Sequence, residues 1–225
     1  MNIYAVIPIR SGSKRFPDKN IYEISGIPLF QFSADVAKQS DIFSKIIISS
    51  DSAEYLNLAN TSNYTTHLRS HGSACDTSHT EDVITEVIQY FNFNKEDWVF
   101  IIQATNPFQQ IKYFKNATSL ITNDISSIVT YRKFKRFFLD DLINGERKRT
   151  QDMPNKFLET GLFWAFNVAG FLKYKKRIIK PYVLVEIDEI DDVDIDYFAE
   201  LQPHLPRLEL IAKEITLKHS LLEDN

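Results

Sequence analysis

Four cationic side chains lie within ten positions, directly after the first apolar run of the sequence. They are Arg10, Lys14, Arg15 and Lys19. Guanidinium and ammonium groups form their strongest hydrogen bonds with charged oxygens, such as those of phosphates. The whole chain is acidic, with a formal net charge of -4, so this positive charge is local. It indicates a small anionic ligand and argues against nucleic acid or a membrane surface as partner. We expect Arg10, Lys14 and Lys19 to neutralise a triphosphate.

The same loop supplies other groups that suit a phosphate. Gly12 permits a close approach of the backbone, and the hydroxyl groups of Ser11 and Ser13 are additional donors. The two common glycine-rich phosphate motifs, G-x-x-x-x-G-K-[ST] and G-x-G-x-x-G, are absent from the sequence. The alternative interpretation of the loop is a solvated basic turn.

Short apolar runs alternate with helical patterns along the chain. The runs predict buried strands at residues 3–9, 45–50, 98–103, 126–132, 161–168 and 182–187. Helices are predicted at residues 28–39, 78–91, 110–122 and 203–225, the second with Ser78 and Glu81 in capping-box spacing. This alternation predicts an α/β fold with a doubly wound, mostly parallel sheet of the Rossmann-like type. With 225 residues and 44% hydrophobic content, residues 1–225 are expected to form one domain.

The predicted sheet places the basic loop at a ligand-binding edge. In open parallel sheets, ligands bind beyond the carboxyl ends of the strands, and residues 10–20 follow such an end. Gln103 and Asp51 also end predicted strands, so contact with a ligand and hydrogen bonding within a turn are both open for them. Residues 131–156 break the alternation and are basic and aromatic, which is typical of a functional segment or an interface arm.

The loop resembles the N-terminal signature of the CMP-sialic acid synthetases. The stretch "IPIRSGSKRFPDKN" at residues 7–20 matches I-P-A-R-x-G-S-K-x-x-P-x-K-N. The matching residues are Arg10, Gly12, Ser13, Lys14, Pro17, Lys19 and Asn20. Further stretches resemble this family, which includes pseudaminic and legionaminic acid cytidylyltransferases, at residues 48–55, 68–84, 101–109, 149–166 and 189–201. The resemblance therefore runs to about residue 202.

The resemblance implies a reaction and a set of site residues. CTP and a nine-carbon 2-keto sugar acid would give a CMP-sugar and pyrophosphate, a step in cell-surface polysaccharide biosynthesis, with Mg²⁺ as cofactor. Ser13 and Asn20 would position the nucleotide, Arg69 would reach the phosphates, and Thr77 and Ser78 would lie near the base. The implied sugar-binding residues are Gln103, Asn106 and Thr160. The implied metal ligands, taken from an acidic run at 188–194, are Asp191 and Glu189.

Departures from the family pattern fall on the sugar side. Leu158 stands where arginine is usual, Thr160 replaces asparagine, and Trp164 replaces tyrosine; Asn106 and Gln109 also differ. The acceptor therefore stays open among N-acetylneuraminic, pseudaminic, legionaminic and other sugar acids. Trp164 is interpreted as a core or dimer residue. A CTP-binding sensor without turnover and a nucleotidyltransferase for another sugar or sugar phosphate are the alternative functions.

The remaining expectations concern assembly and location. Members of the family are typically homodimers, and residues 131–156 are the candidate arm. Cys75 is the only cysteine and is interpreted as a packing residue. His67, His71 and His79 are interpreted as ordinary loop residues, because nothing in the sequence brings them into metal-binding spacing. The sequence shows no signal peptide and no apolar run long enough for a membrane span, so we expect a cytoplasmic protein.

Overall fold

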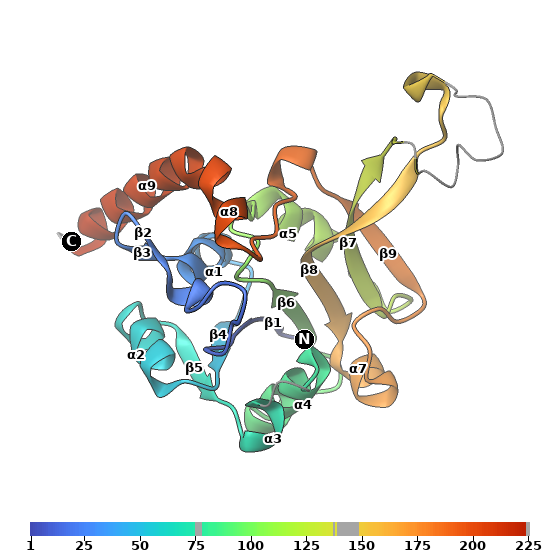
Figure 1. Ribbon diagram of the computed structural model, residues 1–225. Coiled ribbons are helices and arrows are strands. Elements are labelled where there is room, and N and C mark those ends of the chain that lie inside the picture. Colours follow the sequence, from blue (N-terminus) through green and yellow to red (C-terminus); the bar gives the residue numbers. More distant parts are fainter. Residues whose placement is uncertain (75–77, 137, 139–148, 224–225) are drawn as a thin grey trace.

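A seven-stranded sheet organises the chain, of which the structure describes residues 1–74, 78–136, 138 and 149–223 (Figure 1). In this computed structural model the strands are β1 (Ile3–Ile9), β4 (Lys45–Ser50), β5 (Thr65–Leu68), β6 (Trp98–Ile102), β7 (Ser127–Phe134), β8 (Lys156–Asn167) and β9 (Tyr182–Glu186). Their order is β5-β4-β1-β6-β8-β7-β9. Neighbouring strands are parallel, except that β8 is antiparallel to both β6 and β7. The prediction of a mostly parallel sheet is confirmed.

The predicted strands are all present, with differences at their ends. β8 begins at Lys156 rather than at residue 161, because its first residues pair with the far end of β7. β5 was not predicted. Its sequence, TTHL, is short and only His67 is buried in it, so it lacks the apolar run that marked the other strands. A separate hairpin pairs β2 (Glu23–Ile24) with β3 (Ile27–Pro28).

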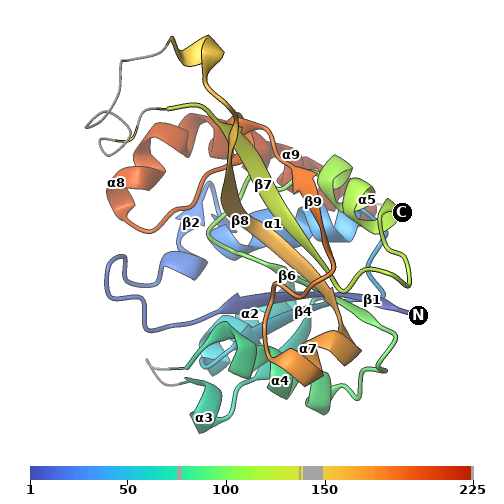
Figure 2. The ribbon, with the colours of Figure 1, turned by 90° about the vertical axis from the view of Figure 1, so that its right-hand side faces the viewer.

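Helices cover both faces of the sheet (Figure 2). The four predicted helices are confirmed as α1 (Leu29–Gln39), α4 (Thr80–Tyr90), α5 (Ile111–Ser119) and α9 (Leu205–Glu223). The others are α2 (Ala53–Thr61), α3 (His71–Ala74), α7 (Val168–Tyr174) and α8 (Phe198–Leu201), with short 3₁₀ turns η1 (Lys19–Ile21), η2 (Thr150–Asp152), η3 (Glu189–Asp191) and η4 (Gln202–His204). None of the helices within the described ranges is both long and apolar enough to cross a membrane.

The predicted N-terminus of α4 is wrong by one residue. His79, not Ser78, is the N-cap, and its backbone N–H donates to Asp82 Oδ2 at 2.9 Å. Ser78 Oγ instead donates to the carbonyl oxygen of Gly72 at 2.8 Å. This bond ties the start of α4 to α3, so the helix begins where the chain leaves that contact.

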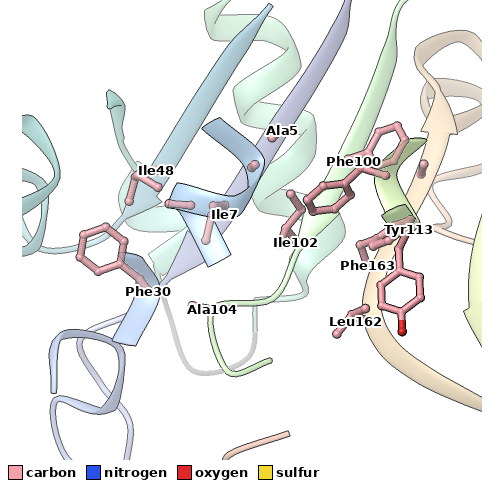
Figure 3. Close-up of a cluster of buried hydrophobic side chains, with 14 of the residues drawn as sticks. Ala5, Ile7, Phe30, Ile48, Phe100, Ile102, Ala104, Tyr113, Leu162 and Phe163 are labelled. Carbon is pink, nitrogen blue, oxygen red and sulfur yellow. The ribbon is translucent and has the colours of Figure 1, made fainter. Parts of the chain in front are cut away.

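The hydrophobic core lies on both sides of the central strands. On one face of the sheet, Phe30 of α1 lies beside Ile48 of β4, as Figure 3 shows, and Phe114 of α5 packs against Phe100 of β6. On the other face α4 and α7 pack against Val6, Val99 and Trp164, among others. Because β1 and β6 are covered on both faces, their sequences are continuous apolar runs. A third cluster joins α9 to the β2–β3 hairpin.

Candidate active site

A cavity of about 520 Å³ lies at the carboxyl ends of β1 and β6. The chain runs from β1 through β4 to β5 on one side and then returns to β6 on the other, so this is the point where the strand order reverses. The described lining residues include six cations and one carboxylate. The cations are Arg10, Lys14, Arg15, Lys19, Arg69 and Arg177, and the carboxylate is Asp196. The cavity therefore suits a polyanion.

The loop after β1 is held in place from both ends. Asp51, at the end of β4, accepts from the backbone N–H of Ser11 at 2.9 Å and from Ser11 Oγ at 3.1 Å. Asn20 is buried, and its Nδ2 donates to the carbonyl oxygen of Arg10 at 2.9 Å. These bonds fix the loop so that Arg10, Ser13 and Lys14 line the cavity.

An ion pair closes the C-terminal end of this loop. Lys19 is 7% exposed, and its Nζ donates to Asp196 Oδ1 at 2.9 Å. Arg15 Nη2 lies 2.6 Å from Asp196 Oδ2. Burial by itself raises the pKa of Asp196, but the hydrogen bonds and charges of Lys19 and Arg15 outweigh it and hold the pKa below its usual value. Asp196 is therefore ionised at neutral pH.

Arg69 lines the cavity at the end of β5, where the protein backbone holds its guanidinium. Nη2 donates to the carbonyl oxygen of Ser49 at 2.9 Å, and Nε donates to Ser49 Oγ at 3.3 Å. Its own backbone N–H donates to the carbonyl oxygen of Ser50 at 2.9 Å. Burial lowers the pKa of Arg69 to about 10, so the side chain still carries its charge at neutral pH.

A buried histidine supports Arg69 from behind. His67 Nδ1 lies 3.0 Å from Ser49 Oγ, and its Nε2 lies 3.6 Å from Glu86 Oε1. The interpretation of His67 as a loop residue is wrong, because it lies in β5 and is 1% exposed. Burial lowers the pKa of His67, so the ring is neutral at neutral pH. Glu86 in turn accepts from the backbone N–H of Ser70 at 2.6 Å.

The N-terminus of α4 opens onto the cavity. Ser78, His79 and Thr80 all line it, and the first N–H groups of a helix favour a negatively charged ligand. Ser78 was predicted at the site, whereas His79 was interpreted as an ordinary loop residue. Thr77 and Cys75 lie outside the described residues.

Three residues form the side of the cavity that lies across β6 from β1. They are Gln103, Trp164 and Arg177, and we call them the β6–β8 wall. Gly161, with φ of 65°, lies against this wall: a Cβ atom there would come within 2.9 Å of Gln103 Nε2 and 3.5 Å of the Trp164 ring. Trp164 is 6% exposed and its Nε1 donates to Glu159 Oε1 at 2.5 Å. Its interpretation as a packing residue covers only part of its role, because it also lines the cavity.

Several predicted site residues do not line the cavity. Asn106 is fully buried, and its carbonyl oxygen accepts from Ser33 Oγ at 3.1 Å. Thr160 is 7% exposed and its Oγ1 donates to Thr130 Oγ1 at 2.9 Å, inside the β7–β8 pair. Ser11 and Gly12 belong to the loop but not to the lining, and a Cβ atom at Gly12 would meet nothing within 4 Å. Their predicted ligand contacts stay predictions.

The two predicted metal ligands lie away from the cavity lining and have protein partners. Asp191 is 4% exposed; Tyr113 OH donates to its Oδ2 at 2.8 Å, and Arg207 Nη2 donates to its Oδ1 at 2.5 Å. Glu189 Oε1 accepts from Arg132 Nη1 at 3.3 Å. Within the described ranges, no three His, Cys, Asp or Glu side chains are grouped as a metal site.

Sequence reasoning missed Asp196 and Arg177. The signal for Asp196 was available, since Asp194 and Asp196 alternate directly before α8. Arg177 lies among several cations after α7, and nothing in the sequence distinguishes it from Lys175 or Lys176. Only the packing of that segment against α4 brings it to the cavity.

The model of the family described as "Cytidylyltransferase" matches residues 4–138, which is more than half of the chain. The chain belongs to the cytidylyltransferase family. It is 26% identical to a Helicobacter pylori protein named pseudaminic acid cytidylyltransferase and UDP-2,4-diacetamido-2,4,6-trideoxy-beta-L-altropyranose hydrolase, over 92% of this chain and 44% of that protein. It is 28% identical to N-acylneuraminate cytidylyltransferase A of Danio rerio, over 92% of this chain and 54% of that one. The chain thus spans about half the length of these curated relatives.

Other cytidylyltransferases are closer in length or share the fold. Pseudaminic acid cytidylyltransferase of Campylobacter jejuni is 25% identical over 86% of this chain and 94% of its own. A solved structure of CMP:2-keto-3-deoxy-manno-octonic acid synthetase complexed with CTP superimposes with a TM-score of 0.72 at 14% identity, covering 95% of this chain and 100% of that one. This likeness shows that the two chains have the same fold.

Proposed function

We propose that this cytidylyltransferase transfers CMP from CTP to the anomeric hydroxyl group of a nonulosonic, sialic acid-like sugar acid and releases pyrophosphate. The observation that carries the proposal is the cavity at the β1–β6 reversal point, with Arg10, Lys14 and Lys19 on one glycine-containing loop. The named activities of the relatives, which act on N-acylneuraminic and pseudaminic acids, supply the substrate class.

The chemistry of this transfer needs charge neutralisation and alignment more than covalent help. The anomeric hydroxyl gives up its proton to solvent as its oxygen forms a bond to the α-phosphorus. The bond from that phosphorus to the bridging oxygen breaks, and pyrophosphate leaves with the negative charge. Cations that are already in place lower the barrier because they stabilise this developing charge. Arg10 and Lys14 would contact the phosphates, Ser13 and Asn20 would position them, and Arg69 is held rigidly enough to do the same.

A divalent cation, Mg²⁺, is part of the proposal. Mg²⁺ usually takes one or two carboxylates and completes its coordination with phosphate oxygens and water. Among the described lining residues Asp196 is the carboxylate that fits this mode, and Asp194 lies two positions before it. Asp191 fits less well, because it does not line the cavity and lies 4% exposed between Tyr113 and Arg207. When bound, the cation would add positive charge at the phosphates.

The proposal also includes a homodimer in the cytoplasm. The described parts of the candidate arm are the end of β7, residues 135, 136 and 138, and the segment from Arg149 to the start of β8; residues 137 and 139–148 lie outside the described residues. In Figures 1 and 2 the paired ends of β7 and β8 extend away from the rest of the sheet. Such an extension is suited to reach a second copy of the chain.

The test is pyrophosphate release with CTP, Mg²⁺ and separate samples of N-acetylneuraminic, pseudaminic and legionaminic acids and Kdo. Release with one acid, and with CTP but not UTP or GTP, would support the proposal and name the acceptor. Release with UTP or GTP would indicate a different nucleotidyltransferase. If the protein binds CTP but releases no pyrophosphate with any of the acids, the proposed transfer to these acids is contradicted. A CTP-binding sensor is then favoured.

A further inference from the structure

We propose that Arg177 binds the carboxylate of the acceptor sugar acid and thereby sets the specificity of the site for an acid. The inference rests on the function proposed above and deepens it. Arg177 follows α7 in the sequence, and its side chain is 33% exposed where it lines the cavity. Its role was not apparent from any sequence motif.

The position of Arg177 separates it from the cations that would bind the nucleotide. The other five lining cations come from the loop after β1 and from the end of β5. Arg177 instead packs on Trp164 of β8, and β6 lies between β8 and β1 in the sheet. A cavity that accepts a triphosphate and a sugar acid together must neutralise two separate anions. The described cation on the β6–β8 wall is Arg177.

The orientation of the guanidinium is fixed by two contacts. Its Cζ lies 4.5 Å from the centroid of the Trp164 ring, and its Nε lies 2.9 Å from Glu81 Oε1. The Glu81 contact uses Nε, and within the described part of the chain neither Nη atom donates a hydrogen bond to another residue. An arginine held on an aromatic face with both Nη atoms available matches the two oxygens of a carboxylate.

Other basic residues near the sugar side are less suitable. Arg132, Lys133, Lys135 and Arg136 line a different hollow at the end of β7, together with Glu189. Leu158, where the family pattern has arginine, is 41% exposed and does not line the cavity. Arg177, in the segment after α7, therefore supplies a guanidinium group that β8 lacks at Leu158.

The test uses the full chain with Arg177→Gln and a matched control, Lys176→Gln, which removes the same charge from an exposed neighbour outside the cavity. The substrate is the acid of the panel that the wild type uses best, and its methyl ester serves as a second probe. For Arg177→Gln we expect the KM for the acid to rise roughly 10- to 100-fold. The KM for CTP should stay within about twofold of the wild-type value, because the substitution removes a contact to the acid and none to the nucleotide. Lys176→Gln should match the wild type.

The ester separates carboxylate binding from a structural role. The wild type should prefer the free acid to the ester, whereas Arg177→Gln should treat both alike, and Arg177→Lys should restore part of the preference. A normal KM for the acid in Arg177→Gln, or an equal rise in the KM for CTP, would overturn the inference while leaving the transfer reaction intact. A wild type that releases no pyrophosphate with any acid would overturn the proposed function itself, and this inference with it.

Discussion

Lys19 Nζ and Asp196 Oδ1 lie 2.9 Å apart although 177 positions separate them in the sequence. The bond joins the loop after the first strand to the segment before α8, so the basic loop and the acidic segment form one site. A buried ammonium group needs such a partner, because an unpaired charge at 7% exposure is strongly destabilising. Incoming phosphates would offer Lys19 and Arg15 new partners and leave Asp196 available for a cation.

Asp196→Asn should raise the Mg²⁺ concentration needed for half-maximal turnover and lower kcat by about 100-fold or more, because a charged ligand is lost. Asp191→Asn is the matched comparison. Both substitutions should lower the free energy of unfolding by about 1–3 kcal/mol, since Lys19 loses its charged partner in one and Arg207 in the other, but Asp191→Asn should leave the Mg²⁺ titration unchanged. Titration of both variants with Mg²⁺, together with thermal unfolding, checks this. A changed Mg²⁺ titration in Asp191→Asn, with a normal one in Asp196→Asn, would indicate that the metal binds at η3 instead.

Arg10→Ala should reduce kcat/KM about 100- to 1,000-fold without changing the unfolding temperature appreciably, because Arg10 is exposed and serves the ligand rather than the core. The control is Lys115→Ala, which removes an exposed cation of α5 outside the cavity. Steady-state pyrophosphate release measures the first effect, and circular dichroism on heating measures the second. Normal turnover in Arg10→Ala would refute the phosphate-binding role of the loop.

Gly161→Ala should impair the sugar side of the cavity. The new Cβ atom would lie 2.9 Å from Gln103 Nε2 and would force this side chain to move. Gly26→Ala is an informative control, because Gly26 also has a positive φ, of 80°, but has nothing within 4 Å of its Cβ position. Both variants should lose about 1 kcal/mol of stability from backbone strain. We expect only Gly161→Ala to raise the KM for the acid, with CTP affinity retained in both.

His67 should make stability depend on pH. Burial lowers its pKa in the folded state, so the unfolded chain binds the proton more readily. The free energy of unfolding should therefore fall as pH decreases from about 6.5 toward the folded-state pKa. His67→Asn should remove this slope. His204 also has a lowered pKa, caused by burial and by Arg207, so unfolding should be measured in a His204→Asn background. An unchanged slope in the double variant would show that His67 does not titrate here.

Replacing residues 135–152 with a short glycine-serine linker should produce a monomer if the arm holds the dimer. Light scattering during gel filtration would give the mass of the wild type and of the variant. The seven-stranded sheet should persist, because strand pairing within the sheet does not depend on the removed segment beyond the end of β7. A monomeric wild type would contradict the proposed assembly at once.

Much of the fold could be predicted because the central strands are buried on both faces. β1, β4 and β6 show this burial as continuous apolar runs, and α1 and α4 show apolar stripes. The antiparallel direction of β8 could not be predicted, since an apolar run has no direction. β5 was missed for a different reason. Backbone hydrogen bonds to β4 hold it in the sheet, and His67 is its one buried residue, so it has no apolar run.

Site residues that are close in sequence could be predicted, and those brought together by tertiary packing could not. Arg10, Lys14 and Lys19 are close in sequence, so their spacing alone predicts a shared ligand. Arg177 and Asp196 reach the cavity through tertiary packing, which a local pattern does not record. In the acidic segment every second residue is acidic from Asp192 to Asp196, so composition does not fix which carboxylate faces the cavity.

The direction of β8 bears on how this protein could be redesigned. The family match ends at residue 138, whereas Gly161, Trp164 and Arg177 all come later in the chain. Because β8 returns antiparallel between β6 and β7, one contiguous stretch of the chain, residues 156–179, carries most of the β6–β8 wall. Under the proposed function, exchanging a cassette of that length between relatives that use different acids should transfer the choice of acceptor and leave the loop after β1 unaltered.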